Sequence, residues 1–570
     1  MVIMNNRSGE YTHTGPFSQL DAQTGHCQES LALTLVLSIN GQDTTIPGAN
    51  IKVCELAILR YGFTGVLEFY VPNDQREDTL IDTFATEDLI SLALGINAVH
   101  NLPEPLPKAF TVKGLVTQKS VTESAYRQVN GAPVLYRYYR IHFADPAQVL
   151  WQQHYPSELY VDDCMTTVIN AQVVSPITLT IDFSPADTIV PLICLALGNT
   201  DNSHPGETGV TNKASFYDFL MGYIHDNNGF FIYDYEEQTY QICLEEPQLQ
   251  NTTAFLPHEI NTIQHTWPAS KRSVTSLLNA TADNSKNTPL TNEQAVAGIK
   301  HDTMLRQSIE DRFNQRKDMQ SNRLTVHGKQ IQVVFNQWPL QTFWPECELS
   351  VDPSVDGQHF LHANQIYRCA SLYINVKALD NRPEKDLDLT YTQYQLLYQA
   401  QGHPTDKPQS VLPKYTLPQY PLYVEGLIVS DQGQDNEKTF DVPKNDDTGQ
   451  FEYKVNIPLW DLTIKVMLEP DYLNSHFYFP FYRDTKLLLA FDLYRAHVVK
   501  VLNWGEGVQL PMATQGNHIL FGKTSEDQTS VSHFYDDGKP VLAIKRNKEN
   551  DTELVRLEEG SIILQTCEDD

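Results

Sequence analysis

The chain has 570 residues and a formal charge of −30, from 71 acidic and 41 basic side chains. By length it should contain roughly three to five domains, and its 28 Tyr and 24 Phe favour strands and turns. A chain this acidic lacks the clustered Lys and Arg that bind nucleic-acid phosphates or anionic lipids, which argues against both kinds of partner.

The first 28 residues are polar, and we expect them to be flexible. They contain no basic segment followed by an apolar one, so no signal peptide is predicted. No apolar run approaches 18 residues, and residues 190–197 are among the longest, so no membrane-spanning helix is predicted either. We therefore expect the protein to be made in the cytoplasm.

The eight cysteines are far apart and form no C-x-x-C pair. In a chain of this length the pattern indicates free buried thiols in a reducing compartment, rather than disulfides or a zinc site. They are Cys27, Cys54, Cys164, Cys194, Cys243, Cys347, Cys369 and Cys567.

The first predicted strands alternate apolar and polar residues from Leu31 to Ile39, and Asn40-Gly41 supplies a two-residue hairpin turn. Further strands are predicted at 57–61, 65–70 and 110–118. A short helix is expected over 86–94, because Thr86 can serve as its N-cap and Gly95 lies just past its end.

Residues 134–143 alternate clearly and predict a strand that ends at Asp145-Pro146. An Asp followed by Pro is typical of an N-cap and first helical residue, so a helix through Trp151 is expected. A second short helix is expected over 160–170.

The strongest helical pattern covers residues 215–225, where apolar side chains repeat at intervals of three and four. Ser215 is a suitable N-cap, and Asn228-Gly229 should end the helix. Residues 230–235 and 240–244 predict a hairpin after it. We interpret the aromatic stripe of this helix as core packing rather than a ligand site.

Residues 279–301 are polar and predict a loop or insertion, and residues 304–316 predict a charged helix. The strands of a second barrel or sandwich are expected at 323–334, 347–351, 365–376 and 386–398. A stiff, extended connector follows. Its prolines are Pro404, Pro408, Pro413, Pro418 and Pro421.

Beyond the connector, short strands are expected at 423–429, 439–442, 453–457, 462–468, 486–491 and 496–502, a number and size that suit a closed barrel such as an OB-fold. Five short apolar strands then follow about every ten residues, at 518–521, 530–535, 541–545, 554–557 and 561–565. Each is too short and too apolar to bury itself, which predicts a stacked β-solenoid or an intertwined needle of several chains. The expected needle core is Ile519, Phe521, Phe534, Val541, Ile544, Leu554, Leu557, Ile562 and Leu564.

Several motifs in the last 150 residues occur in the order seen in the spike proteins of contractile injection machines. These motifs contain Ile457, Pro458, Trp460, His476, Phe477, Phe479, Pro480 and Trp504. The region therefore resembles the VgrG family of type VI secretion and the hub-and-spike proteins of contractile phage tails. Over residues 30–400 the resemblance is looser, and residues 213–219 depart from the family's pattern, so the chain is similar to a divergent member.

The resemblance implies a mainly β, multidomain homotrimer: a hub of β-barrels with short helices, an OB-fold barrel and a trimeric β-helical needle. It implies the inner tube protein, baseplate proteins, a PAAR-like tip protein and effectors as partners, and no cofactor, metal or catalysis. The chain would assemble in the apparatus in the cytoplasm and be driven into the target. The short 504–511 segment leaves no room for an inserted lysozyme, and no effector domain is expected after the last strand.

The implied domains are a flexible N-terminus (1–28), a first hub barrel with a helical insert (29–258), a second hub barrel (259–402), a Pro-rich linker (403–419), an OB-fold (420–505) and the needle (506–570).

Three alternatives stay open. A carbohydrate-binding protein or glycoside hydrolase would use paired carboxylates, although no common catalytic motif is present. A tail-fibre-like adhesin would bind cells. An OB-fold could bind single-stranded nucleic acid through aromatics, but the acidic charge opposes this. His518 and His533 have no metal-ligand spacing, so only symmetry could gather them around an ion.

Overall fold

The computed structural model describes residues 26–73, 77–100, 109–125, 134–198, 214–249, 254–282, 284–307, 309–323, 329–350, 366–406, 410–434, 439–445, 451–467, 481–503, 517–522, 527–549 and 551–567. The fold is mainly β and multidomain, as predicted. Two compact units interleave along the chain. One consists of Met1–His154, Gln172–Pro185 and Ala214–Leu417, and the other of Tyr155–Ala171, Ala186–Lys213 and Pro418–Asp570.

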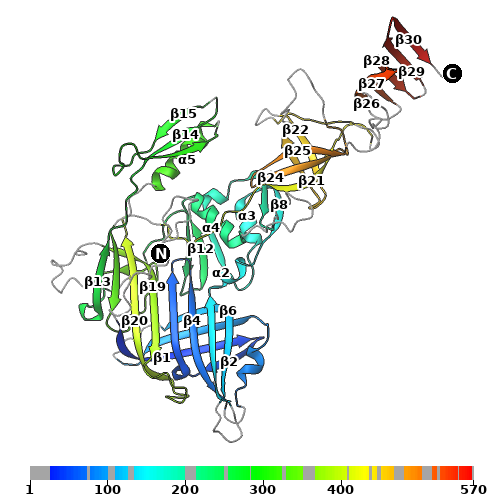
Figure 1. The fold of residues 1–570 in the computed structure, drawn as a ribbon. Coiled ribbons are helices and arrows are strands. Elements are labelled where there is room, and N and C mark those ends of the chain that lie inside the picture. Colours follow the sequence, from blue (N-terminus) through cyan, green and yellow to red (C-terminus); the bar gives the residue numbers. More distant parts are fainter. Residues whose placement is uncertain are drawn as a thin grey trace. The chain divides into compact units, whose positions relative to one another are not determined.

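The first unit contains a 12-stranded sheet in which eight strands close into a ring. The ring order is β20-β1-β5-β6-β7-β4-β3-β19, and β19 pairs back with β20 (Figure 1). Its strands are β1 (Cys27–Ile39), β3 (Ile51–Leu59), β4 (Gly62–Pro72), β5 (Ile90–Ala98), β6 (Phe110–Ala125), β7 (Val134–Ala144), β19 (Tyr367–Ala378) and β20 (Tyr391–Pro404). Both ranges expected to form separate hub barrels, 29–258 and 259–402, supply strands to this ring. The expected boundary between two hub domains at residue 258 stays a prediction.

Other strands extend this sheet: β2 (Gln42–Ile46) pairs with β1, β13 (Ile260–Thr266) and β17 (Gln330–Phe335) extend from β20, and β18 (Glu348–Leu349) pairs with β19. The predicted alternation of β1 is confirmed, because Leu31, Leu33, Leu35, Leu37 and Ile39 are all buried. The hairpin at Asn40-Gly41 is confirmed too, since both residues have positive φ.

Helices and a small sheet accompany the ring in this unit. Asp145 caps α2 (Pro146–Trp151) as predicted, accepting a hydrogen bond from the Gln148 N–H. The helix predicted at 215–225 is α4 (Phe216–Asp226), followed by the expected hairpin of β11 (Phe230–Asp234) and β12 (Thr239–Cys243), which pairs with β9 (Leu179–Asp182). Single 3-10 turns lie at Gly48–Asn50, Ser184–Ala186 and Pro257–Glu259.

One predicted helix was wrong, and another was correct only in its second half. Residues 86–94 lie after helix α1 (Leu80–Phe84) and lead into β5, whose side chains alternate between buried and outward positions. Residues 160–170 are divided between β8 (Ser157–Asp163) and α3 (Met165–Ala171). Gly95, expected just past the end of the first of these helices, lies inside β5.

The segment predicted to be a loop or insertion folds into a small body of its own. It contains β14 (Val274–Asn279), β15 (Lys286–Pro289), β16 (Lys300–Leu305) and α5 (Glu310–Arg323). The strands form a sheet in the order β15-β14-β16, and Leu277, Leu290, Leu305 and Phe313 form its core. The charged helix therefore starts six residues later than predicted, because Met304 belongs to β16.

The second unit contains a two-stranded sheet of β8 and β10 (Val190–Ala196) and a five-stranded sheet in the order β23-β22-β21-β24-β25. These five strands match predicted ones and are β21 (Leu422–Val429), β22 (Glu452–Ile457), β23 (Leu462–Met467), β24 (Lys486–Asp492) and β25 (Arg495–Asn503). The strand expected at 439–442 is absent from the described residues, where an isolated bridge joins Lys444 to Phe451.

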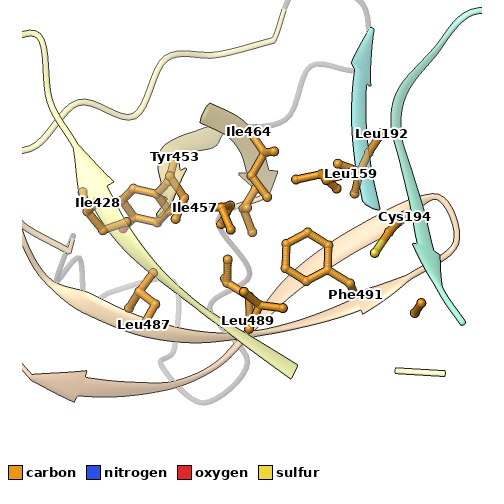
Figure 2. Close-up of a cluster of buried hydrophobic side chains, with 14 residues drawn as sticks. Leu159, Leu192, Cys194, Ile428, Tyr453, Ile457, Ile464, Leu487, Leu489 and Phe491 are labelled. Carbon is orange, nitrogen blue, oxygen red and sulfur yellow. The ribbon is translucent and has the colours of Figure 1, made fainter. Parts of the chain in front are cut away.

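The five-stranded sheet shares a hydrophobic core with β8 and β10. Figure 2 shows Leu159, Leu192 and Cys194 of these two strands facing Phe491 and Ile464. The Tyr420 hydroxyl donates to the Cys194 carbonyl at 2.9 Å. Residues from within the expected hub range thus complete the core of the expected OB-fold.

The last strands form an antiparallel sheet in sequential order. They match the five predicted needle strands and are coloured red in Figure 1: β26 (Asn517–Gly522), β27 (Asp527–Asp536), β28 (Lys539–Lys548), β29 (Asp551–Glu558) and β30 (Ser561–Cys567). Because each strand pairs antiparallel with the next in sequence, the described residues of this sheet do not form the stacked solenoid that was the first alternative.

Candidate functional site: an apolar face on the C-terminal sheet

Tight turns set the register of the last sheet. Asp537-Gly538 joins β27 to β28 with φ values of 48° and 76°, as a two-residue hairpin turn requires. Glu559-Gly560 joins β29 to β30, and Gly560 has a φ of 74°. Since side chains alternate across a strand, these fixed registers decide which residues share a face.

The register places one apolar face across all five strands. Ile519, Val531, Ile544, Val555 and Leu564 are directly opposite one another in a row that crosses the sheet. A second row on the same face contains His533, Leu542, Leu557 and Ile562. Phe521 lies on this face too, opposite Thr529.

This face is open to solvent in the single chain. Leu564 and Ile562 are 75% and 71% exposed, and Ile519, Phe521, Ile544, Leu542, Val555 and Leu557 are also exposed. Contiguous apolar surface of this kind marks an interaction site in soluble proteins, because leaving it in water is unfavourable.

The opposite face of the sheet is partly covered by its own side chains. The Arg556 guanidinium lies 5.7 Å from the centre of the Phe534 ring and pairs with Asp536 and Glu558. Val541, opposite Phe534, is only 1% exposed. The two faces therefore differ: Val541 and Ala543 are buried on this one, whereas the Ile and Leu side chains of the apolar face are exposed.

The nine residues predicted to form the needle core are divided between these faces. Ile519, Phe521, Ile544, Leu557, Ile562 and Leu564 share the exposed apolar face, whereas Phe534, Val541 and Leu554 lie on the other. Three members of the apolar face were missed: Val531, Leu542 and Val555. Counting alternate positions outward from the Gly538 and Gly560 turns would have found them.

The predicted OB-fold motif is described only in part. Ile457 is buried in the core, and Pro458 is exposed. Trp460 contacts the Phe491 ring edge-on and donates from Nε1 to the Ser157 carbonyl at 3.1 Å. His476, Phe477, Phe479, Pro480 and Trp504 lie outside the described residues.

The first unit contains a buried charge cluster that sequence reasoning missed. Arg60 and Arg368 each contact both Glu246 and Glu346, and every one of these side chains is almost fully buried. His403 Nε2 lies 3.3 Å from Glu246. No sequence signal joins residues so far apart in the chain.

The charges in this cluster balance. Burial lowers the pKa of His403 despite its hydrogen bond to Glu246, so the imidazole stays neutral. Burial alone would raise the pKa of Glu246, but the His403 hydrogen bond and the two arginines lower it overall. Two carboxylates therefore face two guanidiniums, and this arrangement clamps distant segments together rather than exposing a reactive carboxylate pair.

The cysteines, all within described ranges, form no disulfides. Five of them, Cys54, Cys194, Cys243, Cys347 and Cys369, are buried as predicted, whereas Cys567 is exposed. Within the described ranges, no group of three or more potential ligands is placed to hold a metal ion. No helix among those residues is both long and apolar enough to cross a membrane.

Neither a protein-family model nor a curated protein matches the sequence. Solved structures do match the fold of the chain. A chain of a lidless PdpA–VgrG complex aligns with a TM-score of 0.69 at 13% identity, over 95% of this chain and 98% of that one. A chain of the lidded Francisella PdpA–VgrG complex aligns with a TM-score of 0.69 at 14% identity, over 95% of this chain and 81% of that one. At such identity the likeness concerns the fold. Nearly the whole chain shares the fold of chains from a PdpA–VgrG complex.

Proposed function

We propose that this chain is the central hub and spike of a contractile injection apparatus and acts as a homotrimer. One observation carries the proposal: the exposed apolar face that crosses all five strands of the C-terminal sheet. The similarity of nearly the whole fold to chains of a PdpA–VgrG complex supports it.

Three copies of the C-terminal sheet can cover one another's apolar faces. With the Leu564 row turned inward, three sheets would form a three-sided needle around a dry core, and the Arg556 face would point to solvent. Burying each Ile or Leu side chain contributes about 1.5–3 kcal/mol, and several from each copy would make a rigid rod. In this proposal, the arrangement takes the place of the trimeric β-helical needle that the family resemblance implies.

The remaining parts fit the same role. The order β23-β22-β21-β24-β25 supports an OB-fold barrel. The hub ring would dock on the inner tube among baseplate proteins, and a PAAR-like protein would cap the tip. The apparatus would assemble in the cytoplasm, and its contraction would drive the spike and its effectors into the target. The protein is structural in this proposal and performs no catalysis.

A matched pair of substitutions in β30 tests the proposal. Leu564 and Gln565 are neighbours, both exposed in the single chain, and they point to opposite faces. We expect the wild-type chain to have the mass of a trimer in light scattering and Leu564→Asp to be monomeric, because three carboxylates would meet in the needle core. Gln565→Asp should stay trimeric. A monomeric wild-type protein, or equal behaviour of the two variants, would contradict the proposal.

Electron microscopy gives an independent check. A trimer of this design should appear as a three-lobed head with a thin stalk, and Leu564→Asp should lose the stalk but keep folded heads.

A further inference from the structure

A histidine lies on the apolar face of the C-terminal sheet. The pairing of β27 with β28, which continues without a register shift from the Asp537-Gly538 turn, fixes the position of His533 on that face. Asn517 occupies the position opposite it on β26. The other members of its row are Leu542, Leu557 and Ile562.

The immediate surroundings of His533 on this face are mostly apolar. Leu542 is directly opposite on β28, and Ile519 and Ile544 are the diagonal neighbours on the two flanking strands. The Tyr535 ring meets the imidazole edge-on, with 5.4 Å between the ring centroids. A phenol brings no charge at neutral pH, so these neighbours offer nothing that would offset a proton on the imidazole.

The charged residues near this face lie towards the ends of its strands. Among the residues that the structure describes, no acidic side chain of the face is opposite or diagonal to His533. Arg546 pairs with Glu553 at 2.8 Å, and Lys539 pairs with Glu559 at 2.7 Å. Both carboxylates therefore already have a cation. The remaining charged positions of the face are Asp527, Lys548 and Asp551.

The proposed needle changes the surroundings of His533. In the single chain this side chain is half-buried, and water can solvate it in either charge state. In the needle its row turns towards the other copies, together with the Leu564 row, and three imidazoles enter one dry core. A neutral imidazole is tolerated there, whereas a charged one without a partner is costly to bury, and three like charges also repel one another.

We propose that His533 makes assembly of the needle sensitive to pH, because neutral imidazoles permit the trimer and their protonation separates its copies. The inference rests on the proposed trimer. An imidazole in water takes up a proton near pH 6.5, so below that pH separate chains bind protons that the closed needle does not. By linkage, the trimer is most stable above that pH and weakens as the pH falls below it.

Light scattering of the full-length protein tests this proposal, in dilution series between about pH 8 and about pH 5.5. The buffers contain EDTA, so that no metal ion held between imidazoles contributes. We expect a trimer at the highest pH. Its dissociation constant should rise below about pH 6.5 by up to about 1,000-fold per pH unit, because three protons are taken up for each trimer that separates.

Two substitutions of the same residue assign the effect. His533→Gln keeps a polar side chain that takes up no proton, and His533→Leu continues the apolar row. Both variants should still be trimers at the lowest pH. His497→Gln is the matched control, because His497 is exposed on β25, outside the C-terminal sheet, and this variant should dissociate in acid as the wild type does.

The outcomes separate this inference from the proposed function. A wild-type trimer whose mass does not change with pH, or His533 variants that dissociate in acid like the wild type, overturns the inference and leaves the spike proposal intact. If neither His533 variant forms a trimer at any pH, His533 serves assembly itself, which also overturns the inference. A wild-type protein that is monomeric at the highest pH overturns both. Acid dissociation that is lost in the His533 variants and kept in His497→Gln supports both.

Discussion

Asp145 shows how one buried carboxylate organises the first unit. It is only 1% exposed and accepts hydrogen bonds from the Tyr240 hydroxyl at 2.6 Å and from the N–H groups of Gln148 and Phe63. These bonds join α2, β12 and β4. Burial nevertheless raises the pKa of Asp145 to about 6.

This pKa predicts a specific dependence of stability on pH. An unfolded Asp releases its proton near pH 3.8, so between there and about pH 6 the folded chain binds more protons and its stability falls as pH rises. Asp145→Asn removes the titration. The unfolding free energy of the wild type relative to the variant should fall by about 2–3 kcal/mol from about pH 4 to 7 in urea titrations. A difference that stays constant or rises with pH would refute this.

The buried charge cluster makes a second prediction at this scale. Glu346→Gln leaves Arg60 and Arg368 with one carboxylate between them, and breaking a buried pair costs about 3–5 kcal/mol. Arg382→Ala breaks an exposed pair with Asp380 and should cost less than about 1 kcal/mol. Chemical denaturation of both variants checks the contrast, and a similar loss in the two would show that burial of the cluster does not matter.

At the scale of elements, hydrogen bonds join the capped helix α4 to the Pro-rich connector that follows the hub strands. The side chains of Ser215 and Asp218 form a capping box, and Asp218 Oδ1 also accepts from the Thr416 N–H at 3.0 Å. The Tyr415 hydroxyl meets His225 Nδ1 at 2.6 Å. The part of the Pro-rich connector near Tyr415 is therefore tied to α4.

The rate of trypsin cleavage after Lys414 can test this attachment, because Lys414 lies in the connector. Asp218→Ala removes the carboxylate half of the capping box and the Thr416 hydrogen bond, so we expect faster cleavage after Lys414. Ser215→Ala removes only the hydroxyl half of the box. It should cost about 1 kcal/mol of helix stability and should leave cleavage at Lys414 near the wild-type rate. Equal cleavage in both variants would show that Asp218 does not hold the connector.

At the scale of the whole molecule, the chain builds its second unit from segments far apart in sequence. Leu192 and Cys194 of β10 share a core with Ile457, Ile464 and Phe491. The backbone N–H of Cys194 also donates to the Leu493 carbonyl at 2.9 Å. Residues 420–505 alone would therefore have an incomplete core.

Leu192 provides the test. Leu192→Ala should cost about 2–4 kcal/mol in the second unit, seen as faster hydrogen exchange in β21 to β25 with unchanged exchange in the ring strands. The matched control is Ile189→Ala, since Ile189 is 70% exposed and its loss should change nothing. Faster exchange throughout the chain would mean that the two units unfold together.

The sequence by itself predicted the elements whose signals are local. The alternation of β1 and β7, the caps of α2 and α4, and the five closing strands all follow from periodicity and turn residues that act within about ten positions. Only the tertiary structure decided what depends on distant residues: the ring that joins β20 to β1, the Arg60 cluster, the core shared by Leu192 and Phe491, and the face to which each apolar residue of β26 to β30 belongs. These depend on strand register and on contacts across hundreds of residues, which no local pattern encodes.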